Sequence, residues 1–346
     1  MKDIIIIGSG WYGLHIANLL QNNYNITILE KNSDILSGSS SHNQNRLHLG
    51  YHYPRCSKTR NLSLKGYEKF IKKYGKLIDD FDNNYYAISK NSFIDFDTYL
   101  QIYSIPEYKH SIIKNTFLKN IDENLIKTNE KIINSNKVKS YFISKLKCNI
   151  KLNYEVCKIE KSNDKLIIND NLVCDMVFNC SNNFLNISPI LNNKYIYEFT
   201  ISLVYERVKF KNSFGAITLM DGNFFSIYPM DISNNYYTVT HVKYTPLKKS
   251  FNIDDIINTK IDEKKVKEIK ELMETDIIKY YSDFKNEFKY KRYFCAYKCK
   301  LNMTNDSRKC NISEKNNIIS INCGKITGIF IVEEYLKSKL NLNISN

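Results

Sequence analysis

The sequence predicts an α/β protein with two lobes, one built on a parallel sheet and the other on an antiparallel sheet with helices. Four β-branched residues, Ile4 to Ile7, lead directly into a glycine-rich turn, as a buried parallel strand does. The run from Asp175 to Asn182 is mostly apolar and ends in small polar residues, which is typical of a second strand of this kind. From Tyr195 to Thr245 apolar residues mostly recur at every second position, and this period indicates an antiparallel sheet.

The N-terminal turn has the spacing of a dinucleotide-binding loop. Gly8, Gly10 and Gly13 follow the strand Asp3–Ile7 in the order Gly-x-Gly-x-x-Gly. The first glycine permits a tight turn, the second lets the backbone approach a pyrophosphate, and the third lets the next helix pack closely. A helix that starts near Gly10 aims its free amides and the positive end of its dipole at the phosphates. The sequence therefore predicts a Rossmann-like lobe with an anion site at this turn.

An acidic residue stands where such a lobe contacts a ribose. Glu30 ends the next strand, 22 residues after Gly8, and a carboxylate about 20 residues beyond the first glycine accepts hydrogen bonds from ribose hydroxyls. A 2′-phosphate would meet a like charge there. FAD or NAD is therefore expected rather than NADP.

Length and composition fit a globular enzyme. A chain of 346 residues, 43% hydrophobic and 25% charged, has room for two lobes. No apolar stretch approaches the roughly 20 residues that cross a bilayer. The run Ile4 to Ile7 is also too short for the core of a signal peptide. We therefore expect no membrane span and a cytosolic location.

The cysteines and the net charge suggest neither a metal nor a nucleic-acid partner. The nine cysteines are odd in number and irregularly spaced, as reduced cytosolic thiols are. Cys295 and Cys299 form a close pair, but no second close pair or paired histidines accompany them, so no metal is expected. The charge of +14 comes from lysines scattered through every segment, without a helix-turn-helix, zinc-finger or aromatic-basic signature. No nucleic-acid partner is expected.

The polar segment after Glu30 favours FAD over NAD. Residues Ser37 to Arg46 contain serines, asparagines and a glycine, and histidines, arginines and aromatic residues follow densely in Leu47 to Arg55. Small hydroxylated residues beside a phosphate site suit the second phosphate and the ribityl chain of a longer, folded-back cofactor. The other interpretation of the segment is an ordinary polar surface loop.

The remaining elements follow from hydrophobic periodicity. Helices are expected at Ser57–Tyr74, Phe96–Lys109, Val138–Leu146 and Ile329–Leu340, with a helical region over Ile253–Tyr281. Strands are expected at Tyr85–Ile88, Ser92–Phe96, Ile150–Ile159, Lys165–Ile168, Leu172–Cys174 and Ile318–Ile321.

Four separated pieces of the chain together resemble the FAD-dependent oxidoreductases of the D-amino-acid oxidase and glycine oxidase superfamily. They are the glycine turn, the Ser/Asn loop with Leu47-His48-Leu49-Gly50-Tyr51-His52-Tyr53, the strand from Asp175 to Asn182, and Gly324-Lys325-Ile326-Thr327-Gly328 before the last helix. The resemblance implies a GR2-type FAD-binding lobe assembled from residues 1–90, 140–190 and 300–346. It also implies a substrate lobe of the α+β class, built from residues 91–139 and 191–299.

The resemblance also implies which residues bind the cofactor. The three glycines would meet the pyrophosphate, Glu30 the adenosine ribose, and the backbone of Val156 the adenine. The glycine loop before the last helix would lie beside the flavin, where amides and a positive dipole end favour the negative charge of a reduced ring. The residues expected to contact FAD are Gly8, Gly10, Trp11, Tyr12, Gly13, Glu30, Lys31, Ser40, Asn43, Arg46, Leu47, Val156, Gly324, Lys325, Ile326, Thr327 and Gly328.

Candidate catalytic and substrate residues come from the same segments. His48 and His52 are candidate bases, because imidazole takes up a proton near neutral pH; each could instead be a packing histidine. Arg308 is either a clamp for a substrate carboxylate or a surface arginine. Further candidates for the wall of the substrate pocket are Tyr53, Arg55, Tyr228 and His241.

These observations lead to one hypothesis and three alternatives. The hypothesis is an FAD-dependent oxidoreductase that oxidises a C–N or C–O bond of a small polar substrate, an amino acid, hydroxy acid or sugar derivative. Hydride would pass to the flavin, and the electrons then to oxygen or another acceptor. The alternatives are an NAD-dependent dehydrogenase, a non-catalytic FAD-binding module and a basic nucleic-acid-binding protein.

Overall fold

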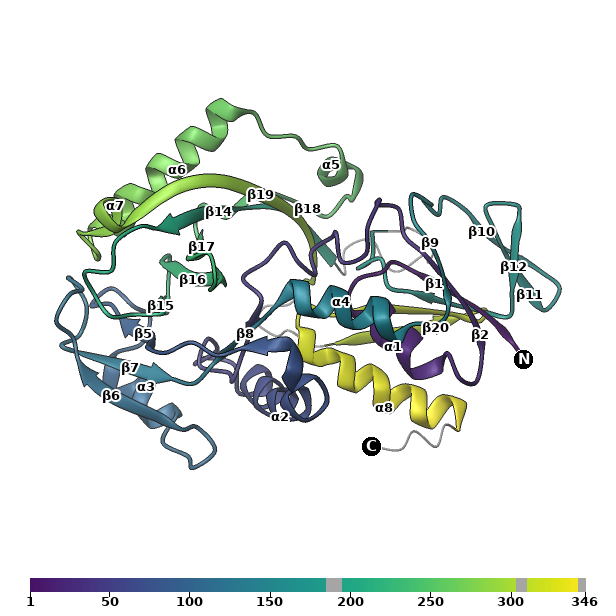
Figure 1. Ribbon diagram of the computed structural model, residues 1–346, viewed down its shortest axis with the longest axis horizontal. Helices are drawn as coiled ribbons and strands as arrows, with labels where there is room; N and C mark the ends of the chain where they lie inside the picture. Colours follow the sequence, from purple (N-terminus) through teal and green to yellow (C-terminus); the bar gives the residue numbers. More distant parts are fainter. Residues whose placement is uncertain (185–194, 303–309, 342–346) are drawn as a thin grey trace.

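A computed structural model describes residues 1–184, 195–302 and 310–341 of the chain (Figure 1). The chain forms two lobes, each built on one of the two larger sheets and covered by helices. The N-terminal strand and the last helix lie in the same lobe. The predicted α/β fold with one parallel and one large antiparallel sheet is confirmed.

The first lobe is built on a six-stranded sheet in the order β20-β21-β13-β1-β2-β9. β1 pairs in parallel with β2 and with β13, β13 with β21, and β2 with β9; only β20 runs antiparallel, against β21. The carboxyl ends of the parallel strands therefore meet at one edge of the sheet, where ligands of open α/β sheets bind. The strands are β1 (Asp3–Ile7), β2 (Asn25–Leu29), β9 (Asn149–Lys151), β13 (Met176–Asn179), β20 (Asn311–Lys315) and β21 (Ile318–Asn322).

Both faces of this sheet are covered, which explains why β1 is an unbroken apolar run. Ile4 and Ile6 pack against helices, and Ile5 and Ile7 pack against a three-stranded meander. Trp11 lies among the helices, with Phe70 and Phe142 edge-on at centroid distances of 5.5 and 5.6 Å. The covering elements are α1 (Trp11–Leu20), α2 (Ser57–Tyr74), α4 (Ser135–Lys145), α8 (Ile329–Leu340), β10 (Ile159–Ser162), β11 (Lys165–Ile168) and β12 (Leu172–Cys174).

The second lobe is built on a nine-stranded sheet in the order β18-β14-β17-β16-β15-β5-β7-β6, with β19 paired to β14 as well. Most pairs are antiparallel, as predicted, but β15 runs parallel to β5. α6 and α7 lie along the convex side of the curved sheet in Figure 1. The elements are β5 (Asn84–Ile88), α3 (Phe96–Ile102), β6 (His110–Lys114), β7 (Asn124–Thr128), β14 (Tyr195–Arg207), β15 (Ala216–Met220), β16 (Phe225–Asp231), β17 (Tyr236–His241), β18 (Pro246–Ser250), α5 (Asp254–Ile257), α6 (Glu263–Ile278), α7 (Phe284–Glu287) and β19 (Phe288–Leu301).

A small three-stranded sheet, in the order β3-β8-β4, lies between the two lobes. Arg46 on β3 pairs with Ile132 on β8, so this sheet carries the segment that follows the Ser/Asn loop. Its strands and the short helices of the chain are β3 (Arg46–Leu47), β4 (Ile78–Asp79), β8 (Lys131–Ile133), η1 (Gly75–Leu77) and η2 (Ile326–Gly328).

Three predicted elements differ from the structure. Residues 92–95 form a bend and not a strand, and Phe96 is the first residue of α3, because the Asp95 side chain accepts a 2.7 Å hydrogen bond from Thr98 N–H and caps this helix. This helix ends at Ile102, well before Lys109. The strand expected over 150–159 stops at Lys151, because Asn153 turns the chain with a φ of 54° and donates its N–H to Asn32.

Candidate functional site

The glycine turn brings α1 directly onto the end of β1. Gly8 has a φ of +96° and donates its N–H to Leu29 O at 2.8 Å. A Cβ on Gly13 would lie 1.9 Å from the carbonyl oxygen of Gly8, so a side chain at this position would force the helix off the turn. The first turn of α1 therefore lies against the edge of the sheet where a pyrophosphate would bind.

The Ser/Asn loop folds over the N-terminus of α1. Leu36 N–H donates to Ser9 O at 3.1 Å, and Ser40 Oγ accepts from Trp11 N–H at 3.1 Å. The first turn of α1 has no acidic residue, so a neutral hydroxyl faces the positive end of the helix dipole. This end of α1 is chemically suited to a phosphate. Asn43 supports the loop itself, since its side chain donates to Ser39 O and accepts from Asn45 N–H.

Glu30 is buried at the end of β2 and is held by four donors. Its Oε2 accepts from Ser9 N–H at 2.8 Å and from Ser9 Oγ at 2.7 Å, and its Oε1 accepts from Asn32 N–H at 2.9 Å and Asn32 Nδ2 at 2.7 Å. The two backbone donors fix the carboxylate, whereas the two side-chain donors can rotate away and leave room for ribose hydroxyls. Tyr154 N–H donates to Glu30 O at 2.8 Å, which draws the segment with buried Val156 alongside; Lys31 is exposed.

The loop before α8 lies against the same helix. Tyr12 Oη donates to Lys325 O at 2.5 Å, and a Cβ on Gly328 would lie 2.3 Å from that hydroxyl. On the other side, a Cβ on Gly66 of α2 would lie 2.3 Å from Thr327 Cβ. Thr327 Oγ1 is buried and has no hydrogen-bond partner among the described residues. The loop is thus closely packed and carries an unsatisfied polar atom.

The predicted histidines meet this loop. The rings of His48, His52 and Tyr53 lie 5.4 to 5.7 Å apart, and Lys325 Nζ lies 4.3 Å from the centre of the Tyr53 ring. Burial lowers the pKa of His52 well below its usual value, and the positive charges of His48, Arg46 and Lys325 lower it further. His52 is therefore neutral near pH 7.

These features fit FAD. The N-terminus of α1 suits the pyrophosphate, and the rotatable donors at Glu30 leave room for the ribose. The loop of Lys325, with the unsatisfied Thr327 hydroxyl, and the imidazoles of His48 and His52 suit the flavin end.

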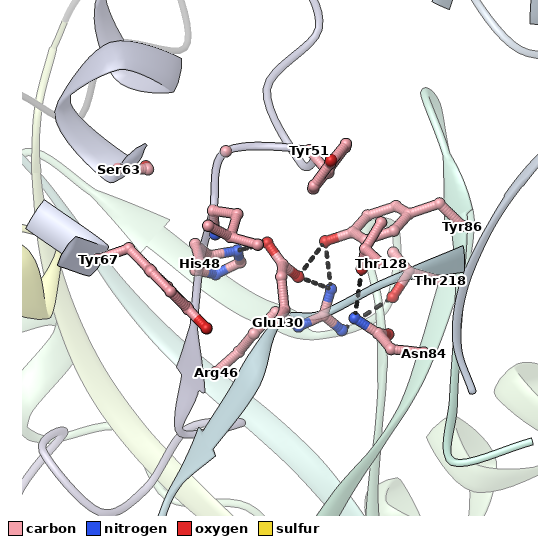
Figure 2. A network of polar contacts seen from close by, with 12 residues as sticks. Arg46, His48, Tyr51, Ser63, Tyr67, Asn84, Tyr86, Thr128, Glu130 and Thr218 are labelled. Atoms are coloured by element: carbon pink, nitrogen blue, oxygen red, sulfur yellow. Dashed lines mark hydrogen bonds and ion pairs between the residues drawn. The ribbon is translucent and has the colours of Figure 1, made fainter. Parts of the chain in front are cut away.

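Two predicted cofactor residues point elsewhere. The Arg46 side chain is buried and extends into the second lobe, where Nη1 donates to Tyr86 Oη at 2.9 Å and Nη2 donates to Thr218 Oγ1 at 2.8 Å and Ser226 Oγ at 2.7 Å (Figure 2). Leu47 is fully buried in the core of the first lobe. The side chains of β3 are thus already packed, and contact of Arg46 or Leu47 with FAD stays a prediction that only their backbone could meet.

The predicted substrate residues do not gather around the histidines. Tyr228 is buried, and the Arg46 guanidinium lies over its ring, 3.9 Å from the ring centre. The Tyr228 hydroxyl donates to Lys131 O. His241 lies in the second lobe, where its Nε2 is 3.6 Å from Asp276 on α6 and its ring is 4.6 Å from the Tyr244 ring. It shares a face of β17 with Val239, which packs in the cluster with α6, so its side chain lies on the α6 face of the sheet and its predicted substrate role gains no support.

Two more predicted residues are the arginines Arg55 and Arg308. Arg55 is half-exposed and forms a pair of hydrogen bonds with Asp221, 2.5 Å from Nε and 3.2 Å from Nη2. Arg308 lies outside the described residues. Among the predicted substrate residues that the structure describes, Tyr53 is the one whose ring lies beside the histidines.

Sequence reasoning missed Glu130, the carboxylate nearest to His48. Glu130 is fully buried between β7 and β8, and its Oε1 lies 3.7 Å from His48 Nδ1 (Figure 2). A single acidic residue between two apolar strands was the available signal, since buried acidic side chains are rare unless paired.

Comparison with known proteins identifies the family. A family model described as FAD dependent oxidoreductase matches residues 3–98. The FAD-dependent monooxygenase FPY4 of Fusarium mangiferae is 30% identical over 97% of this chain and 90% of its own. The chain belongs to the family of FAD-dependent oxidoreductases.

Solved structures of this family of enzymes share the fold. Glycine oxidase from Geobacillus kaustophilus superposes with a TM-score of 0.72 at 11% identity, over 98% of this chain and 95% of that chain. L-alpha-glycerophosphate oxidase from Mycoplasma pneumoniae, solved with FAD bound, superposes with a TM-score of 0.73 at 13% identity, over 100% and 96%. The protein is thus an FAD-dependent oxidoreductase with FAD as its cofactor, and the predictions of FAD and of the superfamily are confirmed. Within the described part of the chain, none of the helices has the length and apolar character that a bilayer crossing requires.

Proposed function

We propose that this FAD-dependent oxidoreductase oxidises a C–N or C–O bond in a small polar substrate, such as an amino acid, a hydroxy acid or a sugar derivative. When bound, FAD would supply the hydride acceptor. The observation that supports the proposal most directly is the contact of Lys325, in the loop before α8, with Tyr53, because it brings two imidazoles to the expected flavin end of the cradle. A substrate held there would face both the acceptor and a group that can take its proton.

His48, His52, Tyr53 and Lys325 would have different roles in the reaction. Neutral His52 and Tyr53 would orient the polar end of the substrate, and His48 would take the proton from its nitrogen or oxygen. The Lys325 ammonium and the N-terminal end of α8 would favour negative charge beside them. Side chains that pack closely around the loop, above all Tyr12 and Thr327, would keep it in place.

A second candidate function is monooxygenation, because FPY4, at 30% identity, is described as a monooxygenase. The two functions differ in the fate of molecular oxygen. An oxidase reduces it to peroxide and leaves the substrate without a new oxygen atom, whereas a monooxygenase transfers one oxygen atom to the product.

The first experiment is a visible absorbance spectrum of the purified protein, before and after acid precipitation, followed by anaerobic addition of amino acids, hydroxy acids and sugar derivatives. Bleaching of the yellow colour by one class identifies the substrate, and turnover under ¹⁸O₂ then separates an oxidase from a monooxygenase. Bound FAD that no donor reduces would contradict the proposal and favour a non-catalytic FAD-binding module.

The lobe boundaries remain part of the proposal. β5 pairs within the second sheet, so we place the end of the first FAD-binding segment before Asn84 rather than at residue 90. The other FAD-binding segments, 140–190 and 300–346, and the substrate segments up to residue 299 stay as predicted. We also propose a cytosolic location, supported by the nine free cysteines.

A further inference from the structure

Glu130 is a buried carboxylate that contacts His48, the backbone next to it and two side chains nearby. Its Oε1 accepts a 2.8 Å hydrogen bond from Leu49 N–H, in the backbone next to His48. Its Oε2 accepts a 2.6 Å hydrogen bond from Tyr86 Oη on β5. The same carboxylate lies 3.7 Å from His48 Nδ1 and 3.8 Å from Arg46 Nη1. Figure 2 shows the side chains of His48 and Arg46 beside Glu130. One side chain thus joins the histidine segment to the second lobe.

Arg46 and Tyr86 hold this carboxylate in place. Arg46 Nη1 donates to Tyr86 Oη at 2.9 Å, and Tyr86 Oη donates to Glu130 Oε2 at 2.6 Å, so the three groups form a chain of hydrogen bonds. Burial of a carboxylate is costly unless a cation and donors compensate it, and both are present here. The Arg46 guanidinium is also stacked on the Tyr228 ring, which leaves it little freedom to move away.

The two histidines therefore lie in different surroundings. His48 has a carboxylate at 3.7 Å, an ion-pair distance that is too long for a strong hydrogen bond. At His52, Nδ1 has no hydrogen-bond partner among the described residues, and most of the charges that act on the ring are positive. The titratable and charged groups around this pair and around Glu130 itself are Arg46, Tyr51, Tyr53, Tyr67, Tyr86 and Lys325. Glu130 is the one carboxylate in this group of described residues, and it lies beside His48.

We propose that Glu130 is a positioning residue that makes His48, and not His52, the imidazole that carries the proton during the reaction. This inference rests on the proposed function for its catalytic meaning. The carboxylate turns Nδ1 of His48 towards itself and favours a proton on that nitrogen. The lone pair of Nε2 is then available to accept a proton from the substrate. It also compensates the positive charge that His48 acquires, next to Arg46 and Lys325, when it takes a second proton.

The test is a titration of the histidine ring signals by NMR in the FAD-loaded protein. With histidine labelled at Cε1, six ring signals are expected, and His48→Asn and His52→Asn variants assign the two of interest. His48 should titrate at least about one pH unit above His52. A higher pKa for His52 than for His48 would overturn the proposal without any change to Glu130.

Three variants test the role of the carboxylate: Glu130→Gln, its matched control Glu130→Asp, and Tyr86→Phe. Glu130→Gln keeps the shape and the Leu49 contact but removes the charge, so the pKa of His48 should fall by about one unit or more. Glu130→Asp keeps the charge and should restore most of the wild-type value. Tyr86→Phe removes a donor from the same carboxylate without removing its charge, and the pKa of His48 should stay or rise. If folded Glu130→Gln leaves the His48 titration unchanged, Glu130 has only a structural role.

The titration does not depend on turnover, so it separates this proposal from the proposed function. If a substrate is found, the pH profile of its anaerobic reduction of the flavin should move to lower pH in Glu130→Gln, in step with the NMR value. If no substrate reduces the flavin but the NMR shift is present, the positioning role stands and the proposed function fails.

Discussion

The Tyr12 hydroxyl donates a 2.5 Å hydrogen bond to the carbonyl oxygen of Lys325, a residue 313 positions further along the chain. Tyr12 belongs to the first turn of α1, above the proposed pyrophosphate site, and Lys325 belongs to the loop at the proposed flavin end. Burial raises the pKa of Tyr12 well above its usual value, so its hydroxyl stays protonated and can donate. This bond therefore links the two ends of the proposed cofactor site.

Tyr12→Phe should weaken FAD binding by about tenfold while the fold is kept, because the aromatic ring still fills its place but the loop loses a buried bond worth roughly 1–2 kcal/mol. The measurement is quenching of flavin fluorescence on titration of the apoprotein with FAD. Tyr335→Phe is the matched control, since Tyr335 donates its hydroxyl to Glu314 at the surface, away from the cradle. Equal FAD affinity in the Tyr12 variant and the wild type would show that the loop is held by packing alone.

Gly13→Ala should be more damaging, because the new Cβ would lie 1.9 Å from a backbone oxygen that cannot move without shifting β1. Overpacking of this kind costs about 1–3 kcal/mol, and it would act on the amides that face the pyrophosphate, so FAD affinity should fall at least tenfold. Equilibrium dialysis with FAD measures this. Gly75→Ala, where a Cβ meets nothing within 4 Å, should bind FAD normally.

The first lobe could be predicted from the sequence because its signals are local. The glycine spacing, the acidic residue after β2 and the periodicity of α2 and α8 each lie within one short segment, and the bounds of both helices, Ser57–Tyr74 and Ile329–Leu340, were predicted to the residue. The contacts across the site were not local. Arg46 follows a polar loop in the sequence, yet its partners Thr218 and Ser226 lie 172 and 180 positions away. Pairing over that separation leaves no local pattern, so both the destination of Arg46 and the role of Glu130 were missed.

His241 shows the same limit from the other side. On an alternating strand its side chain could lie on either face of the sheet, and the sequence contains no information on which of the two faces α6 covers. One step of register changes the face, so an isolated histidine in a strand is a weak predictor of a substrate site.

The buried histidine His241 should make stability depend on pH. Burial lowers its pKa from 6.5 to about 4, against the raising effect of Asp276. Because the folded state holds the proton more weakly than the unfolded state, stability is complete above pH 6.5 and falls as the pH drops towards 4. The loss from this group should be on the order of 2–3 kcal/mol at pH 4.

The His241→Asn variant tests this expectation by thermal unfolding from pH 7 to pH 4, and its stability should fall less steeply with pH than that of the wild type. The variant should also leave the rate of flavin reduction unchanged; a large drop in that rate would restore His241 to the substrate site.

Removing one partner from the buried pair of Arg207 and Glu287 should strongly destabilise the second lobe. Arg207 Nε and Nη2 donate to Glu287 Oε2 at 2.9 and 2.7 Å, both side chains are about 1% exposed, and the guanidinium lies 3.9 Å from the centre of the Phe214 ring. Glu287→Gln would leave a buried cation without its anion, so the free energy of unfolding should fall by about 3–5 kcal/mol, seen as a lower urea midpoint. Lys291→Gln breaks an exposed pair with Glu206 and should cost less than about 1 kcal/mol. A Glu287→Gln variant as stable as the Lys291 control would mean that the carbonyl oxygens of Phe214 and Asn212, which also accept from Arg207, suffice to hold the charge.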